Sequence, residues 1–405
     1  MKKAAFVVIL FACFVRSGAQ PESEQWFRYS SQPVEAQVIS LGATGENTHL
    51  LVKFESLVRT PEHPQNQTVH AEVFIPKQAG VKMPAIVILH SWGVQKPDIE
   101  LSLARTLAKQ GFVTAVITLP YHIQRTPSGY LSGELVIVPD INRMCATMRQ
   151  AVLDTMRLID WLQSHPQVSS DQIGIVGISL GAIIGALALG VETRLQAGVL
   201  VLGGANLARV LWRSPLTMNL RGELRSKGIG YERLRDELLS VEPLTYLRGQ
   251  YGDRVLMVNG RYDLVIPREG AVALRRALGE GPILWLNTGH YGPALVRPAL
   301  FHLIARFFSA KLRKDSEPFT FTLPHTLHEP TIRIGLLYSG VWGARASAAL
   351  DLWQWEREGR AGVALQVSPR NISLLVGFRP LSPLQVGVEL SSRPPAGYIL
   401  FHFVL

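Results

Sequence analysis

Residues 173–191 constrain the fold of this 405-residue chain more than any other stretch, because two different structures could account for them. By hydropathy alone the stretch could be a membrane helix, since about twenty residues pass with a single hydroxyl group. Its residue types divide it differently. Residues 173–178 are rich in β-branched side chains and suit a short strand buried on both faces. Residues 182–189 are small and apolar and suit a helix packed against that strand.

The five residues between these two segments form a G-x-S-x-G pentapeptide, with Gly177 and Gly181 on either side of Ser179. A chain that turns directly from a strand into a helix has little room for side chains two residues before and after the turn, and glycine provides that room. Ser179 is then exposed at the tip of the turn, with its hydroxyl at the helix N-terminus. This pattern favours a nucleophilic serine over a buried structural serine or a membrane span.

The N-terminus predicts export. Lys2 and Lys3 precede the apolar residues 4–15, and small residues follow. The apolar run is too short to span a membrane comfortably, so we expect residues 1–19 to be a signal peptide and residues 20–33 to be a polar leader. This predicts the periplasm or outer membrane of a Gram-negative bacterium, or secretion.

Charge and cysteine content narrow the possible partners. The formal net charge is +10, and removal of the three basic residues of the signal peptide lowers it to +7. A basic chain could bind nucleic acid, but its lysines and arginines are scattered and no run exceeds two, so we expect a generally basic surface and no nucleic-acid partner. Only Cys145 remains after processing, so the mature chain can form no intrachain disulfide, and we expect this cysteine in the core.

From residue 85 onward, short apolar segments alternate with helical ones. Buried strands separated by helices indicate right-handed crossovers and a parallel sheet with both faces covered. Three earlier strands, at residues 34–40, 50–56 and 69–75, would extend this sheet antiparallel at one edge. The other predicted strands are 85–90, 112–119, 173–178, 198–202, 255–259 and 282–286, and the predicted helices are 99–109, 141–164, 271–278 and 294–308.

Residues 205–250 interrupt this alternation with Arg-rich helical segments. In sheets of this kind, ligands bind in the crevice at the carboxyl ends of the strands, and an insertion after a strand lies over that crevice. We therefore expect a cap that shapes the pocket, in preference to a surface insertion that does not contact the pocket.

A serine hydroxyl becomes a strong nucleophile only when a base takes its proton and a carboxylate holds that base. The turn at Ser179 therefore predicts an acid after a later strand and a histidine after the last one. Asp263 follows the strand at 255–259, and His290 follows the strand at 282–286. Alone, each could be an ordinary loop residue, but their order after Ser179 predicts a catalytic triad.

The oxyanion of an acyl-transfer intermediate also needs hydrogen-bond donors. We expect one to be the backbone N–H of Leu180, directly after the nucleophile. The other should come from the loop after the strand at 85–90, with the backbone N–H of Trp92 as the candidate and Gly93 easing the turn. Arg125 could meet an anionic substrate group or form a structural ion pair. The residues predicted to line the substrate pocket are His90, Ser91, Gly93, Tyr121, His122, Arg125 and Tyr291.

The pentapeptide, Asp263, His290 and the loop at 90–93 resemble the α/β-hydrolase superfamily over about residues 34–312. The nearest branches are the dienelactone hydrolase, acetyl xylan esterase and prolyl oligopeptidase-like groups. The resemblance implies an α/β fold for residues 34–315, with an eight-stranded, mostly parallel sheet and helices on both faces. It also implies hydrolysis through a serine acyl-enzyme without a metal or an organic cofactor. Many relatives carry His-Gly-Gly-Gly or His-Gly where this chain has His-Ser-Trp-Gly, which leaves the second oxyanion donor open.

Residues 316–405 have a different texture. Lysine is absent after Pro318, and period-two alternation predicts about six strands of about ten residues in an all-β antiparallel meander. Strands with one apolar face and one small or polar face resemble those of outer-membrane β-barrels. Six is fewer than the eight strands of the smallest ordinary barrel. We therefore expect either association with the outer membrane or with other chains through residues 331–405, or a soluble meander whose apolar face packs elsewhere.

Together these patterns favour an exported serine hydrolase that cleaves the carboxylic ester of a small molecule. A peptidase of the prolyl oligopeptidase-like type is the close variant. A non-catalytic hydrolase-fold binding module, tethered to the outer membrane by the C-terminal strands, is the alternative from another class.

Overall fold

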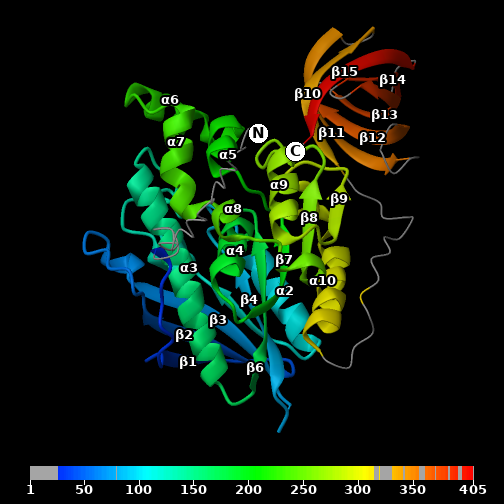
Figure 1. Ribbon diagram of the computed structural model, residues 1–405. Helices are drawn as coiled ribbons and strands as arrows, with labels where there is room; N and C mark the ends of the chain where they lie inside the picture. The colour runs from blue at the N-terminus through cyan, green and yellow to red at the C-terminus, as the bar shows by residue number, and fades with distance from the viewer. Residues whose placement is uncertain are drawn as a thin grey trace, which may run out of the picture.

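The computed structural model describes residues 26–313, 319 and 331–404, apart from short gaps at 79, 341–342, 355–360, 370, 382–383 and 391–394. The predicted signal peptide and residues 20–25 of the predicted leader lie outside these residues. Figure 1 shows a twisted central sheet with helices on both faces, and a separate barrel built from the C-terminal strands.

The central sheet has nine strands in the order β1-β2-β3-β5-β4-β6-β7-β8-β9, one more than the resemblance implied. The first three run antiparallel to their neighbours and the other six are parallel, which confirms the predicted mixed sheet and its antiparallel edge. The ninth strand arises because β1 pairs with β2 along its whole length. The strands are β1 Gln37–Thr44, β2 Asn47–Glu55, β3 Thr68–Pro76, β4 Met83–Leu89, β5 Val113–Ile117, β6 Val168–Ile178, β7 Leu195–Val201, β8 Val255–Gly260 and β9 Ile283–Leu286.

Two layers of helices cover this sheet. One layer packs on the larger apolar cluster, and α2 and α10 pack on the smaller cluster across the sheet. The stretch that could have been a membrane helix divides into β6 and α4, as its residue types predicted. Cys145 is a buried free thiol within α3. The larger helices are α2 Asp98–Lys109, α3 Ile141–Ser164, α4 Leu180–Val191, α9 Arg268–Leu278 and α10 Arg297–Leu312.

Across the part of the chain that the structure describes, no helix is both long enough and apolar enough to cross a membrane.

The segment at 205–250 folds as four short helices between β7 and β8. Its two ends are held together by the buried carboxylate of Glu242, which accepts the backbone N–H groups of Asn206 at 3.0 Å and Leu207 at 2.7 Å. Removing these N–H groups from water without an acceptor would be costly, so Glu242 fixes where the segment leaves and rejoins the sheet. The helices are α5 Leu207–Arg213, α6 Met218–Ser226, α7 Tyr231–Glu237 and α8 Pro243–Tyr246.

Six antiparallel strands form the C-terminal unit, and they close into a barrel because β15 pairs with β10. Closure at six strands was not expected from the sequence. Small residues on the inward face, such as Gly335, Ala349 and Ala364, leave the space that this narrow circumference requires. The strands are β10 Ile332–Ser339, β11 Gly343–Gln354, β12 Ala361–Ser368, β13 Asn371–Leu381, β14 Leu384–Leu390 and β15 Ala396–Val404.

Candidate active site

Ser179 occupies the sharp turn between β6 and α4, with φ 55° and ψ −112°. A non-glycine residue rarely adopts a positive φ, and such strain concentrates at functional sites. The flanking glycines make the turn possible through close approach. A Cβ on Gly177 would overlap the carbonyl of Gly181, and a Cβ on Gly181 would overlap the carbonyl of Leu89. The pentapeptide therefore has the geometry of a nucleophile elbow.

The structure brings the three predicted triad residues together. Ser179 Oγ lies 2.9 Å from His290 Nε2, and His290 Nδ1 lies 2.8 Å from Asp263 Oδ2. The other carboxylate oxygen of Asp263 accepts the backbone N–H groups of Val265 at 2.8 Å and Ile266 at 2.9 Å. An ionised carboxylate can only accept, so His290 donates through Nδ1 and presents the lone pair of Nε2 to the serine hydroxyl. This is the tautomer that a general base requires.

The two predicted oxyanion donors both belong to residues that line one cavity with Ser179. The N–H of Leu180 lies in the first turn of α4, where N–H groups have no carbonyl partner within the helix. In the other loop, the N–H of Gly93 donates to His122 Nε2 at 3.1 Å and is therefore engaged. The N–H of Trp92, in the same loop, stays the predicted second donor.

The side chain of His90 links this loop to the segment that follows β5. Its Nε2 accepts the backbone N–H of Leu119 at 3.0 Å, so its proton lies on Nδ1, which donates to the carbonyl of Ser91 at 2.8 Å. The ring is fully buried, and burial lowers the pKa of His90 from 6.5 to about 3. At neutral pH, His90 is therefore an uncharged linker between two loops.

His122, in the segment that follows β5, also holds this loop through a ring hydrogen bond. Its Nε2 accepts the N–H of Gly93, so its Nδ1 donates to the carbonyl of Pro120 at 2.9 Å. Burial lowers the pKa of His122 from 6.5 to about 4. Both histidines were predicted to line the pocket. They instead hold the loop at residues 90–93, and Trp92 of this loop contacts the pocket.

Arg125 was also predicted to line the pocket, and this prediction is wrong. Its guanidinium is completely buried, where Nη2 forms an ion pair with Asp154 Oδ2 at 2.8 Å. It also donates to the carbonyls of Asn66 at 2.8 Å and Thr118 at 3.0 Å. Tyr121 is buried beside it, with its backbone N–H bound to the side-chain oxygen of Asn66. Arg125 therefore has the structural ion pair that the sequence left as the alternative.

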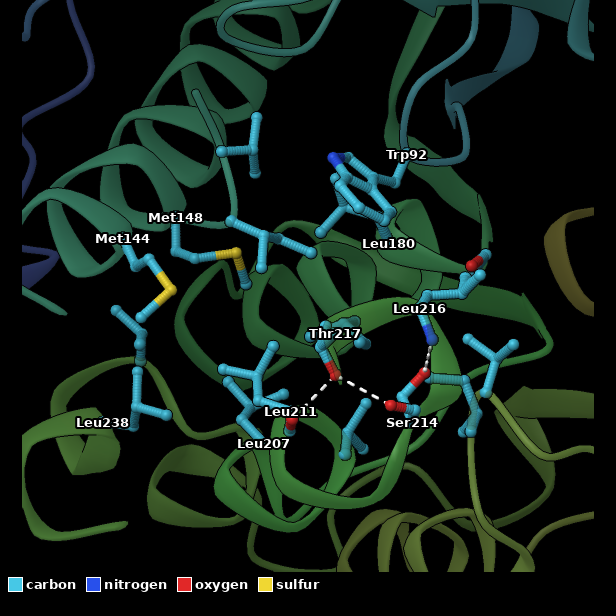
Figure 2. Close-up of a pocket in the computed structure, with 18 residues that line it drawn as sticks. Trp92, Met144, Met148, Leu180, Leu207, Leu211, Ser214, Leu216, Thr217 and Leu238 are labelled. Carbon is cyan, nitrogen blue, oxygen red and sulfur yellow. Dashed lines mark hydrogen bonds between the residues drawn. The ribbon is translucent and has the colours of Figure 1, made fainter. Parts of the chain in front are cut away.

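One cavity of about 780 Å³, its open mouth included, starts at Ser179 and extends beneath the helical segment at 205–250 (Figure 2). No charged side chain is among its lining residues. The two hydroxyl groups that residues 205–250 bring to this cavity form hydrogen bonds within the protein. Ser214 Oγ accepts the backbone N–H of Leu216, and Thr217 Oγ1 donates to the carbonyl of Leu211. Residues 205–250 contribute Leu207, Val210, Leu211, Ser214, Leu216, Thr217, Leu238 and Val241 to the lining.

Sequence reasoning missed several side chains of this cavity, among them three large ones. The indole of Trp92 forms one wall and donates to the carbonyl of Gly133 at 2.8 Å, although only the backbone of Trp92 was given a role. Met144 and Met148 line the cavity from α3, away from Trp92 (Figure 2). Their helical spacing is that of ordinary core residues, so the sequence carries no signal that distinguishes them.

A second cavity, of about 670 Å³ with its opening, also reaches Ser179. His290 and the predicted residues Ser91 and Tyr291 line it, together with Arg297 and apolar side chains of α10. Among the described residues, no group of three or more His, Cys, Asp or Glu side chains is placed to hold a metal ion. The predicted pocket residues that line neither cavity are His90, Gly93, Tyr121, His122 and Arg125.

Comparison with known sequences gives a family match and distant relatives. Residues 52–238 match the family described as "Alpha/beta hydrolase domain containing 18". An uncharacterized protein of Mycobacterium tuberculosis (strain ATCC 25618 / H37Rv) is 27% identical over 241 residues, which are 57% of this chain and 54% of that protein. The uncharacterized protein PA2218 of Pseudomonas aeruginosa is 30% identical over 135 residues, 33% of this chain and 32% of that protein. The chain thus spans about half or less of the length of these curated relatives.

Solved structures show the same architecture. An acetyl xylan esterase from Paenibacillus sp. R4 aligns with TM-score 0.56 and 18% identity, over 70% of this chain and 91% of that one. Acetyl xylan esterase 1 from Thermoanaerobacterium sp. JW/SL YS485 aligns with TM-score 0.55 and 16% identity, over 71% and 92%. The acylaminoacyl peptidase of Pyrococcus horikoshii aligns with TM-score 0.50 and 18% identity, over 71% and 43%. With its mixed sheet and its strand-turn-helix at Ser179, the chain has the α/β-hydrolase fold, followed by a closed antiparallel barrel at its C-terminal end.

Proposed function

We propose that this protein is a serine hydrolase that cleaves carboxylic esters with an apolar acyl group. The observation that carries the proposal is the unbroken hydrogen-bond chain from Ser179 Oγ through His290 to Asp263. Two solved structures of the same fold are named as acetyl xylan esterases, which supports the ester class.

Each group in this chain has one task. Ser179 Oγ attacks the ester carbonyl while His290 Nε2 takes its proton, and Asp263 stabilises the imidazolium that forms. The N–H groups of Leu180 and Trp92 hold the oxyanion of the tetrahedral intermediate. His290 then gives its proton to the departing alkoxide. A water molecule, deprotonated by the same ring, attacks the acyl-enzyme and releases the acid and the free serine.

From the positions of these groups we assign one cavity to the leaving alcohol and the other to the acyl group. The leaving alcohol must receive its proton from His290, so its place is the cavity lined by His290 and Tyr291. The acyl group extends toward the opposite side, into the cavity lined by Trp92 and Leu180. Since no charged side chain lines that cavity, each buried CH₂ group of an acyl chain adds about 0.8 kcal/mol of favourable transfer energy. An acyl group with several methylenes therefore fits better than acetate.

A series of p-nitrophenyl esters from acetate to laurate tests this proposal on the purified full chain. We expect kcat/KM to rise about fourfold for each added CH₂ until the cavity is filled. Ser179→Ala should lose about a million-fold in turnover if the triad acts as a unit. Ser102→Ala, on α2 and away from both cavities, is the matched control and should hydrolyse esters like the wild type. Unchanged turnover by Ser179→Ala would rule the proposal out.

The same groups can cleave an amide, so a panel of acylated peptide amides belongs in the experiment. The fold of the acylaminoacyl peptidase makes this comparison relevant. A higher kcat/KM for the amides than for matched esters would reassign the protein as a peptidase.

A further inference from the structure

The barrel formed by β10–β15 has its polarity inverted relative to a protein that folds in water. Its outward side chains are apolar or small, and none of those that the structure describes carries a charge. Many are large, such as Leu336 at 64% exposed and Ile372 at 66% exposed. They occur around the whole circumference and are not confined to one face. Further examples are Tyr338, Val367, Phe378, Val388 and Phe401.

The interior of the barrel holds the charged groups. Arg333 is buried in an ion pair with Asp351, with Nε to Oδ2 at 3.1 Å, and Arg345 is buried in an ion pair with Glu389. Ser373 donates to Glu389 at 2.8 Å. Beside these pairs lie a small apolar group around Leu337, Leu375 and Leu400 and further buried polar side chains, among them Gln366, Gln385 and His402. In water, burying ion pairs while exposing leucine and isoleucine would be unfavourable on both counts.

Hydrocarbon around the barrel removes this conflict. The exposed apolar side chains would then contact acyl chains, and the paired backbone of a closed barrel leaves no edge to be satisfied. The strands contain 7 to 12 residues. At about 3.3 Å per residue and with a tilt of about 40°, these strands rise about 18 to 30 Å, so the longer ones, β11 and β13, span the apolar band of about 25 Å found on outer-membrane barrels and the shorter ones span most of it.

We propose that residues 332–404 are embedded in a lipid bilayer, with the outward apolar belt of β10–β15 in contact with lipid acyl chains. The barrel is smaller than the eight-stranded outer-membrane type. Its small inward residues and its two internal ion pairs replace the wider polar interior of such barrels.

A contact just before the first barrel strand indicates which edge of the hydrolase domain faces the membrane. Thr331 Oγ1 donates to the carbonyl of Asn287 at 2.9 Å, and Asn287 lies between β9 and His290. The rim at which β10 begins is therefore next to the carboxyl ends of the sheet strands, as Figure 1 shows beside β9. The edge of the sheet that carries Ser179 and His290 would face the bilayer.

Flotation of the full chain with phospholipid vesicles in a density gradient tests the proposal. We expect the wild type to float with the vesicles. Leu336→Arg places a charge near the middle of β10, and it should lower the ratio of vesicle-bound to free protein by about thirtyfold or more. The matched control is Leu131→Arg, at a site 72% exposed on the hydrolase domain, which should float like the wild type. A wild type that stays at the bottom of the gradient would overturn the proposal.

A second measurement covers the case in which Leu336→Arg fails to fold. With Cys13 replaced by serine, Leu336→Cys and Leu131→Cys, each labelled with a polarity-sensitive fluorophore, differ only in the surface that carries the dye, because Cys145 is buried. Spin-labelled acyl chains in the vesicles should quench the dye at 336 and leave the dye at 131 unchanged. Equal, water-like emission from both sites would contradict lipid contact. A soluble dimer without lipid that shields the dye at 336 would assign the belt to a second copy of the chain and equally overturn the proposal.

Discussion

His122 Nε2 accepts the backbone N–H of Gly93 at 3.1 Å, and this contact helps to hold the loop that carries Trp92. The contact depends on a close approach at Gly133, where an added Cβ would overlap the His122 ring and the nitrogen of Gly93. The histidine lines neither of the two cavities, so we interpret it as a positioning residue for the loop that carries the predicted donor, the N–H of Trp92.

Replacing His122 with leucine should therefore lower kcat more than it raises KM. The N–H of Gly93 would lose its acceptor, and the neighbouring N–H of Trp92 would no longer be held in place. Loss of one oxyanion donor costs about 10²–10³ in kcat, so partial misplacement should cost about tenfold to a hundredfold. His122→Gln keeps an acceptor oxygen and should recover part of the loss. Steady-state kinetics on one ester measure this, and a change confined to KM would contradict the positioning role.

The lowered pKa values of His90 and His122 predict a loss of stability in mild acid. Both folded-state pKa values, about 3 and about 4, lie below the value of 6.5 for an exposed histidine. The unfolded chain therefore binds more protons below pH 6.5, and the stabilisation present above that pH is lost as the pH falls toward 4 and then 3. The slope approaches about 1.4 kcal/mol per pH unit for each histidine.

Urea denaturation at pH 7.5, 6 and 5 measures this slope. His122→Gln should show a smaller loss between pH 7.5 and 5 than the wild type, because one of the histidines with a lowered folded-state pKa is gone. An unfolding free energy that does not change over this interval would show that these rings are accessible to protons in the folded state.

The ion pair of Arg125 with Asp154 supports a stability prediction. Either Arg125→Met or Asp154→Leu leaves a buried partner uncompensated, which costs about 3–5 kcal/mol. The combined replacement Arg125→Met with Asp154→Leu removes both charges and should cost less than the sum of the two single changes. Urea midpoints of the four proteins provide this double-mutant cycle. Additive effects would mean that the two side chains do not interact.

The width of the acyl cavity gives a specificity prediction. Met148→Trp should fill space opposite Trp92, so the longest ester that is cleaved well becomes shorter while turnover of the acetate ester changes little. Met148→Leu has nearly the same volume and serves as the control with the wild-type profile. The ester series gives the readout. If Met148→Trp lowered kcat/KM equally for esters of all chain lengths, the cavity would not be the acyl site.

Local sequence signals were sufficient for much of the active site. The turn at Ser179 could be predicted because glycine on both sides is a steric requirement of that turn, visible within five residues. Asp263 and His290 could be predicted from their order and from their position directly after apolar strands. Helix α3 was predicted with the bounds that the structure has, because its apolar run begins after Asp140, whose side chain caps the first turn.

Other features depend on contacts that no local pattern reveals. An arginine in a loop at the end of a strand looks like a substrate contact, and only the fold shows that Asp154 of α3 lies against Arg125. Closure of the barrel depends on the pairing of β10 with β15, two strands at opposite ends of the unit. The period-two pattern predicted which side chains share a face, but not whether the sheet closes.

The central claim is that Ser179 is a nucleophile activated by His290 and Asp263. A fluorophosphonate probe reacts with such a serine, and mass spectrometry of the digested protein identifies the residue that carries it. We expect one adduct per chain, on Ser179, and labelling about a million-fold slower in folded His290→Gln. Absence of an adduct on the folded wild type, an adduct on another residue, or equal rates in wild type and His290→Gln would contradict the claim.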